Sequence, residues 1–413
     1  MEKYDVIIIG GGPAGLFTAI NIKKEMSVLI LEKNQKVGKK LLMAGAGRCN
    51  ITHEGEMSEF FNHYGNNYKF LKTVFKEFSN KDMINFFKRR GMGIIVDKNG
   101  KIFPETEKSK DILKILINEC MKKGVVIKNN ETVLKAEEIK EEDKKIDEKF
   151  IIKTKNNIYM CDKLVISTGG KSYPTSGSSG DGYIFAKNLG HKIVSLKPAL
   201  APAFITDYKF KNISGVSLKN IKIYLYRENK KIGEHIGDIG FTHVGLSGPG
   251  ILDFSRDIKE DDVLKVNFIG EKIDKFKKEF IKETEKDGNV IIKNYLKRYK
   301  IPESLIKSVL EQINMDILTK MAEISKDKRN KLAKMFCEYP FEIDRMGDYN
   351  IAMATTGGVA LKEINGKTME SKIVKNLFFA GEVVDIDGDT GGYNIQAAFS
   401  MGYTVAKSIN GGL

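Results

Sequence analysis

A glycine-rich turn near the N-terminus has the residue types and spacing to bind a dinucleotide. Gly10, Gly12 and Gly15 form a GxGxxG pattern between an apolar run at residues 4–9 and an apolar helical pattern at residues 16–24. In this strand, turn and helix setting, the first glycine permits a tight turn and the second lets a pyrophosphate approach the backbone. The third lets the helix pack close to the strand. Free N–H groups at the helix start then favour phosphate.

A carboxylate after the next apolar run extends this pattern. Residues 27–31 read as a second strand, and Glu32 follows them. At the end of a second parallel strand, Glu32 can accept hydrogen bonds from ribose hydroxyls. A glycine-rich loop without a ligand is the alternative, but the strand, the helix and the acid together favour a dinucleotide site. The pattern does not separate NAD from FAD, and its place at the start of the chain favours FAD.

Two internal segments are expected to return to the same ligand. Residues 33–50 are rich in Gly and Ala and end in Arg48-Cys49-Asn50, where Arg48 could pair with a phosphate or lie on a flexible surface loop. Residues 133–139, 150–154 and 158–161 predict an antiparallel meander with a charged hairpin tip at residues 140–149. The meander leads into a buried strand at residues 163–168 and the turn Gly169-Gly170, which would reach the carboxyl edge of the parallel sheet.

The C-terminal segment carries a second candidate ligand-binding turn. A short apolar strand at residues 376–380 is followed by Gly381 and Glu382, then by Gly391-Gly392 and an apolar helix from about residue 395 to residue 409. Glu382 can bond a ribityl or ribose hydroxyl, and a helix start aimed at the flavin would stabilise its anionic reduced form. The alternating acids at positions 385, 387 and 389 suggest calcium as an alternative. The Gly and the closing Glu of an EF-hand loop are missing, so no metal is predicted.

Composition narrows the classes of function. The chain has 413 residues, 41% of them hydrophobic, and a formal net charge of +14. Its lysines are mixed with glutamates along the whole chain and no RNA- or DNA-binding motif accompanies them, so nucleic-acid binding is disfavoured. The four cysteines form no CxxC pair, which argues against a redox dithiol or a zinc site and fits a reducing cytoplasm. No apolar run is long enough to span a membrane.

The chain is expected to be an α/β protein of two or three domains. Residues 1–190 and 346–413 form one discontinuous dinucleotide-binding domain with a parallel sheet and the antiparallel meander. Between them, alternating apolar and polar residues at 191–271 predict an antiparallel β-barrel. Lys/Glu-rich helical spacing at 272–345 predicts a helical subdomain.

Three residues are candidates for acid–base chemistry beside a flavin. His243 lies in a glycine-rich loop, Tyr173 could protonate a carbanion, and Lys171 could polarise a carbonyl. Each has a plain structural alternative, namely hydrogen bonding, loop packing or a solvated charge. Tyr393 is expected to pack against the flavin rather than to act as a general acid. Since no second GxGxxG exists, any NAD(P)H would bind transiently at the flavin face.

The chain resembles the BaiN-like, YhiN-type flavoproteins of the glutathione-reductase-like FAD superfamily. The stretches that carry the resemblance follow in family order over nearly the whole chain: GGGPAG at 10–15, KKLLMAGAGRCNITH at 39–53, STGGKSYPTSGSSGDGY at 167–183, FTHVGLSGPGIL at 241–252, TTGGV at 355–359, TMESK at 368–372 and FAGEVVDIDGDTGGYNIQAAFSMGY at 379–403. AGAGRCN departs from the more glycine-rich family run.

The resemblance implies non-covalent FAD and a set of binding residues. Lys33 would join the glycine turn and Glu32 at the ADP half, the backbone of Val133 would meet the adenine, and residues near 48–50 and 381–396 would line the pyrophosphate, ribityl and flavin. The full predicted set is Gly10, Gly12, Pro13, Ala14, Gly15, Glu32, Lys33, Lys40, Gly47, Arg48, Cys49, Asn50, Val133, Thr168, Gly169, Gly170, Gly381, Glu382, Gly392, Asn394, Ile395 and Gln396.

These observations predict an FAD-dependent oxidoreductase. The favoured reaction is the NAD(P)H-linked reduction of a C=C bond that is activated or conjugated to a carbonyl. The substrate would be a small or steroid-like molecule. An oxidase that passes electrons from an amino ketone or amino acid to O2 is the alternative. A flavin-containing RNA-binding or RNA-modifying protein, suggested by the +14 charge, is a third and less favoured hypothesis. The substrate, the electron donor and the oligomeric state stay open.

Overall fold

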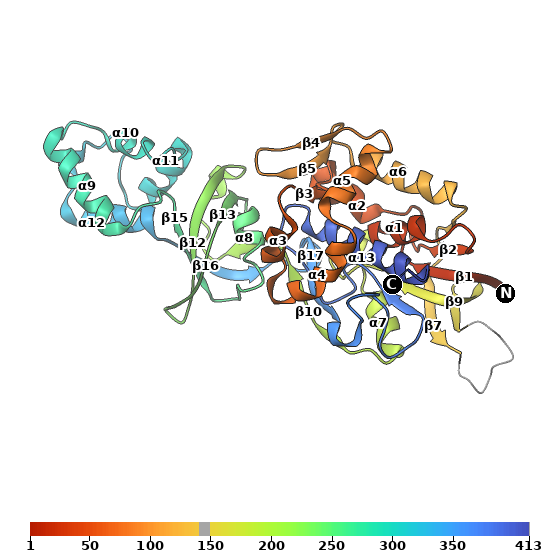
Figure 1. Ribbon diagram of the computed structural model, residues 1–413. Coiled ribbons are helices and arrows are strands. Elements are labelled where there is room, and N and C mark those ends of the chain that lie inside the picture. Colours follow the sequence, from red (N-terminus) through yellow and green to blue (C-terminus); the bar gives the residue numbers. More distant parts are fainter. Residues whose placement is uncertain (140–148, 413) are drawn as a thin grey trace. The chain divides into compact units, whose positions relative to one another are not determined.

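The computed structural model describes residues 1–139 and 149–412, which divide into two compact units (Figure 1). The first unit comprises Met1–Pro198 and Ala352–Leu413, and the second comprises Ala199–Ile351. The charged hairpin tip predicted at residues 140–149 lies, except for its last residue, outside the described residues. Among the described helices, none is long and apolar enough to cross a membrane.

A mainly parallel sheet forms the centre of the first unit. Strand β1 (Glu2–Ile9) pairs in parallel with β2 (Val28–Leu31) on one side and with β9 (Ile158–Ile166) on the other, and β6 (Val126–Lys128) adds to β2. The last four residues of β1 and all of β2 are buried, as is usual for strands inside a parallel sheet. The predicted parallel sheet is confirmed.

Strand β9 joins the parallel sheet to the antiparallel meander. Its first four residues pair antiparallel with β8 (Phe150–Thr154), which pairs with β7 (Val133–Glu138), and its last three pair parallel with β18 (Leu377–Phe379). The sequence pattern predicted two segments here, but the strand is continuous. Asp162 and Lys163, which interrupt the apolar run, form an ion pair and leave the pairing with β1 intact.

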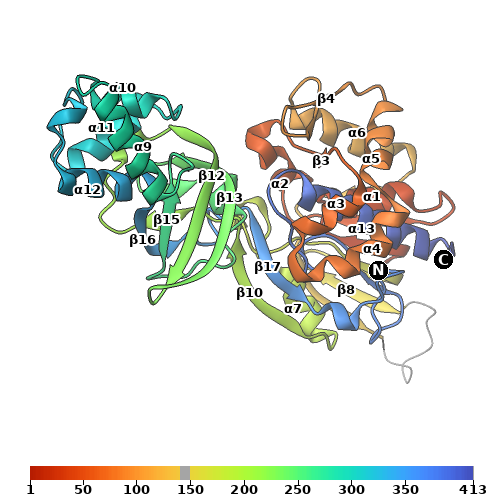
Figure 2. The same cartoon turned by 60° about the vertical axis from the view of Figure 1, so that its left-hand side comes forward.

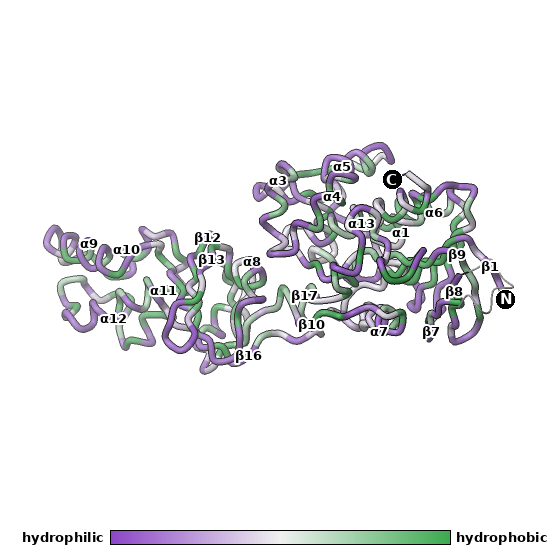
Figure 3. Tube along the Cα trace, turned by 60° about the horizontal axis from the view of Figure 1, so that its bottom comes forward, coloured by the Kyte–Doolittle hydropathy of each residue, from purple (hydrophilic) through white to green (hydrophobic). Residues whose placement is uncertain are grey.

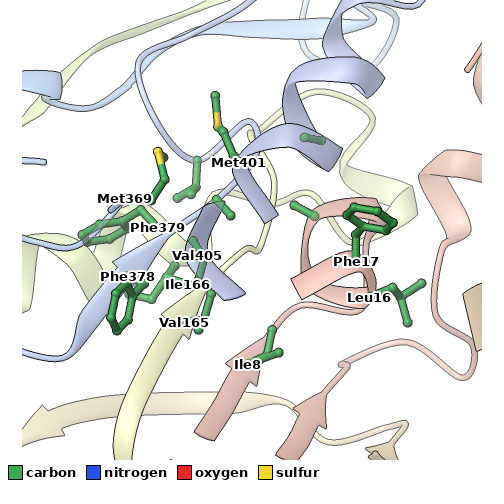
Figure 4. Packing of buried hydrophobic residues seen from close by; sticks show 14 of the residues in the cluster. Ile8, Leu16, Phe17, Val165, Ile166, Met369, Phe378, Phe379, Met401 and Val405 are labelled. Atoms are coloured by element: carbon green, nitrogen blue, oxygen red, sulfur yellow. The ribbon is translucent and has the colours of Figure 1, made fainter. Parts of the chain in front are cut away.

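Two helices from opposite ends of the sequence pack together over this sheet. Helix α1 (Pro13–Asn21) contacts α13 (Tyr393–Ile409), and the rings of Phe17 and Phe399 lie 4.7 Å apart. Figure 4 shows Phe17 of α1, Ile166 of β9 and Val405 of α13 in the buried cluster of the first unit. The other described helices and strands of the first unit are α2 (Lys39–Met43), β3 (Thr52–His53), α3 (Met57–Phe60), α4 (Tyr68–Glu77), α5 (Asn80–Lys88), β4 (Ile94–Val96), β5 (Lys101–Pro104), α6 (Ser109–Lys122), α7 (Asp181–Asn188), β10 (Ile193–Ala199) and β17 (Ala354–Val359).

The second unit is built on a closed antiparallel barrel. Its strands, in order around the barrel, are β11 (Ala203–Ile205), β14 (Gly245–Ser247), β13 (Lys230–Phe241), β12 (Ser217–Arg227), β15 (Val263–Asn267) and β16 (Tyr339–Met346). The sequence pattern assigned most of β16 to the helical segment at 272–345. That assignment is wrong for these residues because Tyr339, Phe341 and Ile343 are buried at every second position, the period of a strand.

Helices complete the second unit. Helix α8 (Pro249–Leu252) packs on β13, while α9 (Ile273–Lys286), α10 (Ile292–Lys297), α11 (Glu303–Gln312) and α12 (Lys326–Cys337) lie together (Figure 2). Both hydrophilic and hydrophobic residues occur along α9 and α12 (Figure 3). Phe276, Leu332 and Phe336 are buried in a cluster that also includes the barrel residues. This unit therefore has its own hydrophobic core.

Candidate functional site

Five parallel strands of the first unit end at the same edge of the sheet, because Lys128 at the end of β6 is in register with Leu31 at the end of β2. Ile9 is in register with Leu31 on one side and with Ile166 on the other, and Ile166 is in register with Phe379. The chain therefore leaves β6, β2, β1, β9 and β18 side by side. The carboxyl edge of such a sheet is where nucleotides bind in α/β folds.

The glycine turn after β1 has the steric features of a pyrophosphate cradle. Gly10 has a φ of 108°, and a Cβ at Gly15 would lie 2.1 Å from the Gly10 carbonyl oxygen, so both positions require glycine. A Cβ at Gly12 would instead project into open space, with no described atom within 4 Å. No described side chain caps the start of α1 at Pro13. The first turn of α1, which includes the buried Ala14, is therefore open to a phosphate group.

The acid after β2 is held by the backbone. One Glu32 carboxylate oxygen accepts from the Gly11 N–H at 3.0 Å, and the other accepts from the backbone and side-chain amides of Asn34 at 2.9 and 2.8 Å. Lys33 points to Asp181, with which it forms an ion pair, and to the Ser179 hydroxyl. Glu32 thus fixes the glycine turn while keeping acceptor capacity.

A second carboxylate joins two distant parts of the predicted site. One Glu382 oxygen accepts from the Lys40 ammonium at 2.8 Å, and the other accepts from the Thr355 backbone N–H at 2.7 Å. The buried Thr355 hydroxyl in turn accepts from the backbone N–H groups of Lys171 and Ser172, at 2.8 and 3.0 Å. Sequence reasoning assigned no role to Thr355 or Ser172, and only their place in the TTGGV and STGGKSYP stretches could have drawn attention to them.

The turn after β9 lies next to this network. A Cβ at Gly170 would be 2.7 Å from a Glu382 oxygen, and Gly169 has a φ of 75°, which favours glycine. The Thr168 hydroxyl is buried and has no hydrogen-bond partner among the described residues. Gly381, at the end of β18, also has a positive φ, 79°. The four residues give the sheet edge small side chains and one unsatisfied hydroxyl.

The segment after α2 places its three polar residues differently. Arg48 pairs with Glu107 at 2.7 Å and lies over the Phe103 ring, and it is half exposed. Cys49 is buried, and burial raises the pKa of its thiol to about 12, so the thiol is neutral at pH 7. The Asn50 side-chain oxygen accepts from the Ile102 N–H at 3.2 Å. Gly47, with a φ of 87°, makes the turn before them.

The start of α13 is the second open helix terminus of the first unit. Gly392 precedes the helix with a φ of 94°, and no described side chain caps it. The Asn394 amide exchanges two hydrogen bonds with the backbone of Gly388, at 2.7 and 2.8 Å. Gln396 is buried and bonds Thr52 and Ser400. Asn394 and Gln396 therefore shape this loop through contacts within the protein. Ile395, which lies between them, is partly buried. The last predicted residue of the set, Val133, is buried in β7.

An imidazole and tyrosine cluster lies at the same helix start. The Tyr393 ring is stacked with His63 at 3.9 Å and with His53 at 5.4 Å, each at an interplanar angle of 15°. His63 Nδ1 lies 3.0 Å from an Asp389 carboxylate oxygen, and Tyr64 donates to the Tyr393 carbonyl oxygen at 2.8 Å. His63 and Asp389 are therefore within hydrogen-bond distance of each other. Sequence reasoning did not predict that His63 and Asp389 are in contact, because the two residues are far apart in the chain.

The three residues predicted for acid–base chemistry divide between the two units. Lys171, which is exposed, and Tyr173, which is partly buried with a φ of 55°, lie in the loop after β9. His243 is exposed in the turn between β13 and β14 of the second unit. The structure therefore brings Lys171 and Tyr173 near the network around Thr355, while His243 belongs to a separate compact unit.

The residues at this sheet edge fit FAD. The open space at Gly12 and the uncapped starts of α1 and α13 suit a pyrophosphate and an electron-rich ring system. The sequence profile described as HI0933-like protein Rossmann domain matches residues 4–408. The chain belongs to the HI0933-like family. The resemblance stated from the sequence motifs and the predicted Rossmann-like FAD-binding fold are thereby confirmed.

Full-length relatives of this HI0933-like protein include two named enzymes. It is 32% identical, over 99% of this chain and 100% of the relative, to a "Ribosomal RNA dihydrouridine synthase" of Haemophilus influenzae. It is 26% identical, over 97% of this chain and 98% of the relative, to a "3-dehydro-bile acid delta(4,6)-reductase" of Clostridium scindens.

Among solved structures, the HI0933-like protein shares its fold with a 3-ketosteroid-Δ4-(5α)-dehydrogenase from Rhodococcus jostii. The TM-score is 0.51 and the identity 14%, and the match covers 98% of this chain and 97% of that one. At this identity the likeness shows the fold alone. The family and its relatives confirm two predictions: the cofactor is FAD, and the protein is an FAD-dependent oxidoreductase.

Proposed function

We propose that this protein reduces a C=C bond conjugated to a carbonyl, and that its substrate is a uracil ring in RNA. The observation that carries this proposal is the common chemistry of the two relatives. Forming dihydrouridine saturates the uracil C5=C6 bond, which is conjugated to the C4 carbonyl, and the other named activity also reduces C=C bonds in a 3-oxo compound. The uracil substrate is preferred because the relative named for it shares 32% identity over the full chain.

The cofactor and the protein have separate tasks in this reaction. When bound, FAD accepts electrons from a donor, for which we propose NAD(P)H, and supplies the hydride. The glycine turn at Gly10 to Gly15 would hold the pyrophosphate, since the Gly12 position faces open space. The ion pair of Lys40 and Glu382 would keep its part of the site neutral. The N-terminal end of α13 carries positive partial charge, which favours the anionic reduced flavin.

Reducing the C=C bond also requires a proton at the carbon next to the carbonyl. Three side chains of the first unit can supply it: Tyr173, Lys171, and His63 oriented by Asp389. Replacing the true donor, by Tyr173→Phe, Lys171→Met or His63→Gln, should slow substrate reduction roughly 100-fold. Reduction of the bound flavin by NAD(P)H should stay unchanged, since that step needs no such proton. A variant that slows flavin reduction and substrate reduction equally would not identify the replaced residue as the proton donor.

An anaerobic two-step experiment tests the function. The FAD-loaded protein is first mixed with NADH, NADPH or an amino acid, and loss of the flavin absorbance is followed. The reduced protein is then mixed with a ribosomal RNA transcript or with a 3-oxo-Δ4,6 steroid. Reoxidation by the RNA, with dihydrouridine found by mass spectrometry, supports the proposal. Bleaching by the amino acid and not by NADH or NADPH, with no reoxidation by the RNA or the steroid until O2 is admitted, would contradict it and favour an oxidase.

A steroid-like small molecule is the second candidate substrate. It is favoured by the full-length relative named as a bile acid reductase. In the same experiment, reoxidation by the 3-oxo-Δ4,6 steroid and not by RNA would replace uracil by a small enone while leaving the reaction type in place.

A further inference from the structure

Helix α12 of the second unit carries a dense set of cations. Over Lys326–Cys337 it contains four lysines and one arginine against one acidic residue, Asp327. The buried side of the helix consists of Leu332, Ala333, Phe336 and Cys337. Its lysines are all exposed, and the arginine is partly so: Lys326, Lys328, Arg329, Lys331 and Lys334. The helix is thus held by its apolar side and presents its cations to solvent.

Several cations of the neighbouring helices are held in ion pairs, although Lys277, Lys278 and Lys282 on α9 have no carboxylate within 4.0 Å among the described residues. Lys275 on α9 pairs with Glu271, Lys297 on α10 pairs with Glu303, and Arg298 pairs with Glu279 and Glu283. Within residues 1–139 and 149–412, by contrast, no carboxylate lies within 4.0 Å of a cationic group on α12. The positive charge of α12 is therefore not neutralised inside the protein.

A shallow groove concentrates part of this charge. Lys331 and Lys334, three residues apart on α12, line it together with Lys209 from the loop after β11, and its volume is about 390 Å³. Gln312, Ile313 and Met335 complete the lining. The Gln312 side chain is fixed, because its oxygen accepts from the Tyr339 hydroxyl at 2.5 Å and its nitrogen donates to the Ser308 carbonyl. Three lysines therefore contribute to the lining of one groove, beside a glutamine whose side chain is held by two hydrogen bonds.

We propose that α12 and this groove bind the phosphate backbone of RNA. Ammonium groups are point-charge ligands for phosphate, and residues three apart on a helix are neighbours on its surface, spaced about 4.5 Å along the axis. A row of unpaired cations gains by replacing the counterions of a polyanion, whereas paired cations gain little. This inference rests on the proposed function, since it assigns to the second unit the sequence-independent part of binding an RNA substrate.

The test compares two triple variants of the FAD-loaded protein. Lys209→Gln, Lys331→Gln and Lys334→Gln are combined in one, and Lys275→Gln, Lys293→Gln and Lys297→Gln, all in ion pairs, are combined in the matched control. Binding of a fluorescent ribosomal RNA fragment is measured by anisotropy between 50 and 200 mM salt. The groove variant should bind about tenfold more weakly, with a salt slope smaller by about 2. The control should bind like the wild type, and both should keep flavin content and NAD(P)H reduction.

Each other outcome separates this inference from the function. If the wild type makes dihydrouridine while the groove variant binds RNA with an unchanged slope, the surface is overturned and the function stands. If the wild type neither binds RNA nor reduces it, the RNA-binding surface and the proposed function are both wrong. If the wild type binds phosphatidylserine vesicles through these lysines and not RNA, the surface is a membrane contact and the inference is wrong.

Discussion

The Lys40 ammonium and the Glu382 carboxylate lie 2.8 Å apart although 342 residues separate them in the sequence. Their side chains are 27% and 19% exposed, so the pair is largely shielded from water. The contact ties α2, from the first cofactor segment, to the turn after β18, from the last. Both termini of the chain thus contribute to one site.

Removing one partner of this pair should weaken cofactor binding more than removing both. Lys40→Met leaves the Glu382 charge uncompensated beside an anionic dinucleotide, and we expect FAD affinity to fall about tenfold. Adding Glu382→Gln should recover part of the loss. The double-mutant cycle, measured by FAD titration, should give a coupling free energy of about 1 kcal/mol. A coupling of zero would show that the pair does not act on the cofactor.

We expect the hydroxyl oxygen of Thr355 to stabilise the fold by accepting hydrogen bonds. The methyl group of the same side chain should not replace this contribution. Thr355→Val removes the acceptor for two N–H groups, those of Lys171 and Ser172, at a fully buried position. We expect a loss of about 2 kcal/mol in the free energy of unfolding by urea. Thr355→Ser keeps the oxygen and serves as the matched control. Equal stability of the two variants would contradict the hydrogen-bond account.

Local sequence patterns were sufficient for the scaffold but not for the contacts across it. The run at residues 4–9, the glycines at 10, 12 and 15 and the strand at 150–154 were predictable, because turn geometry and apolar periodicity act over a few residues. The partnership of His63 with Asp389 and the role of Thr355 depend on which strands meet, which no local pattern encodes. Strand β16 was missed because the charged residues between its buried positions resemble the helix before it.

Acid should destabilise the first unit through His191. Its side chain is fully buried, with Nε2 2.9 Å from the Ser371 hydroxyl and Nδ1 3.3 Å from Glu363. Burial lowers the pKa of His191 below its ordinary 6.5, and Glu363 only partly offsets this. The unfolded chain therefore binds the proton first, so stability is complete above pH 6.5 and falls as the pH drops through the folded pKa.

The check is the melting temperature of the apoprotein from pH 7.5 to pH 5. His191→Gln, which cannot titrate, should show a shallower decline than the wild type over this range, whatever its stability at pH 7.5. Parallel declines in the two proteins would rule out His191 as the source of the acid sensitivity.

The most direct test of the FAD site compares two variants, each of which adds one methyl group by replacing a glycine with alanine. At Gly12 an added Cβ would meet no described atom within 4 Å, while at Gly15 it would lie 2.1 Å from the Gly10 carbonyl oxygen. Gly12→Ala should therefore melt within about 1 °C of the wild-type apoprotein yet bind FAD at least about tenfold more weakly, because the methyl occupies space meant for the pyrophosphate. Gly15→Ala should unfold more readily even without FAD. Unchanged FAD affinity in a folded Gly12→Ala protein would contradict the account.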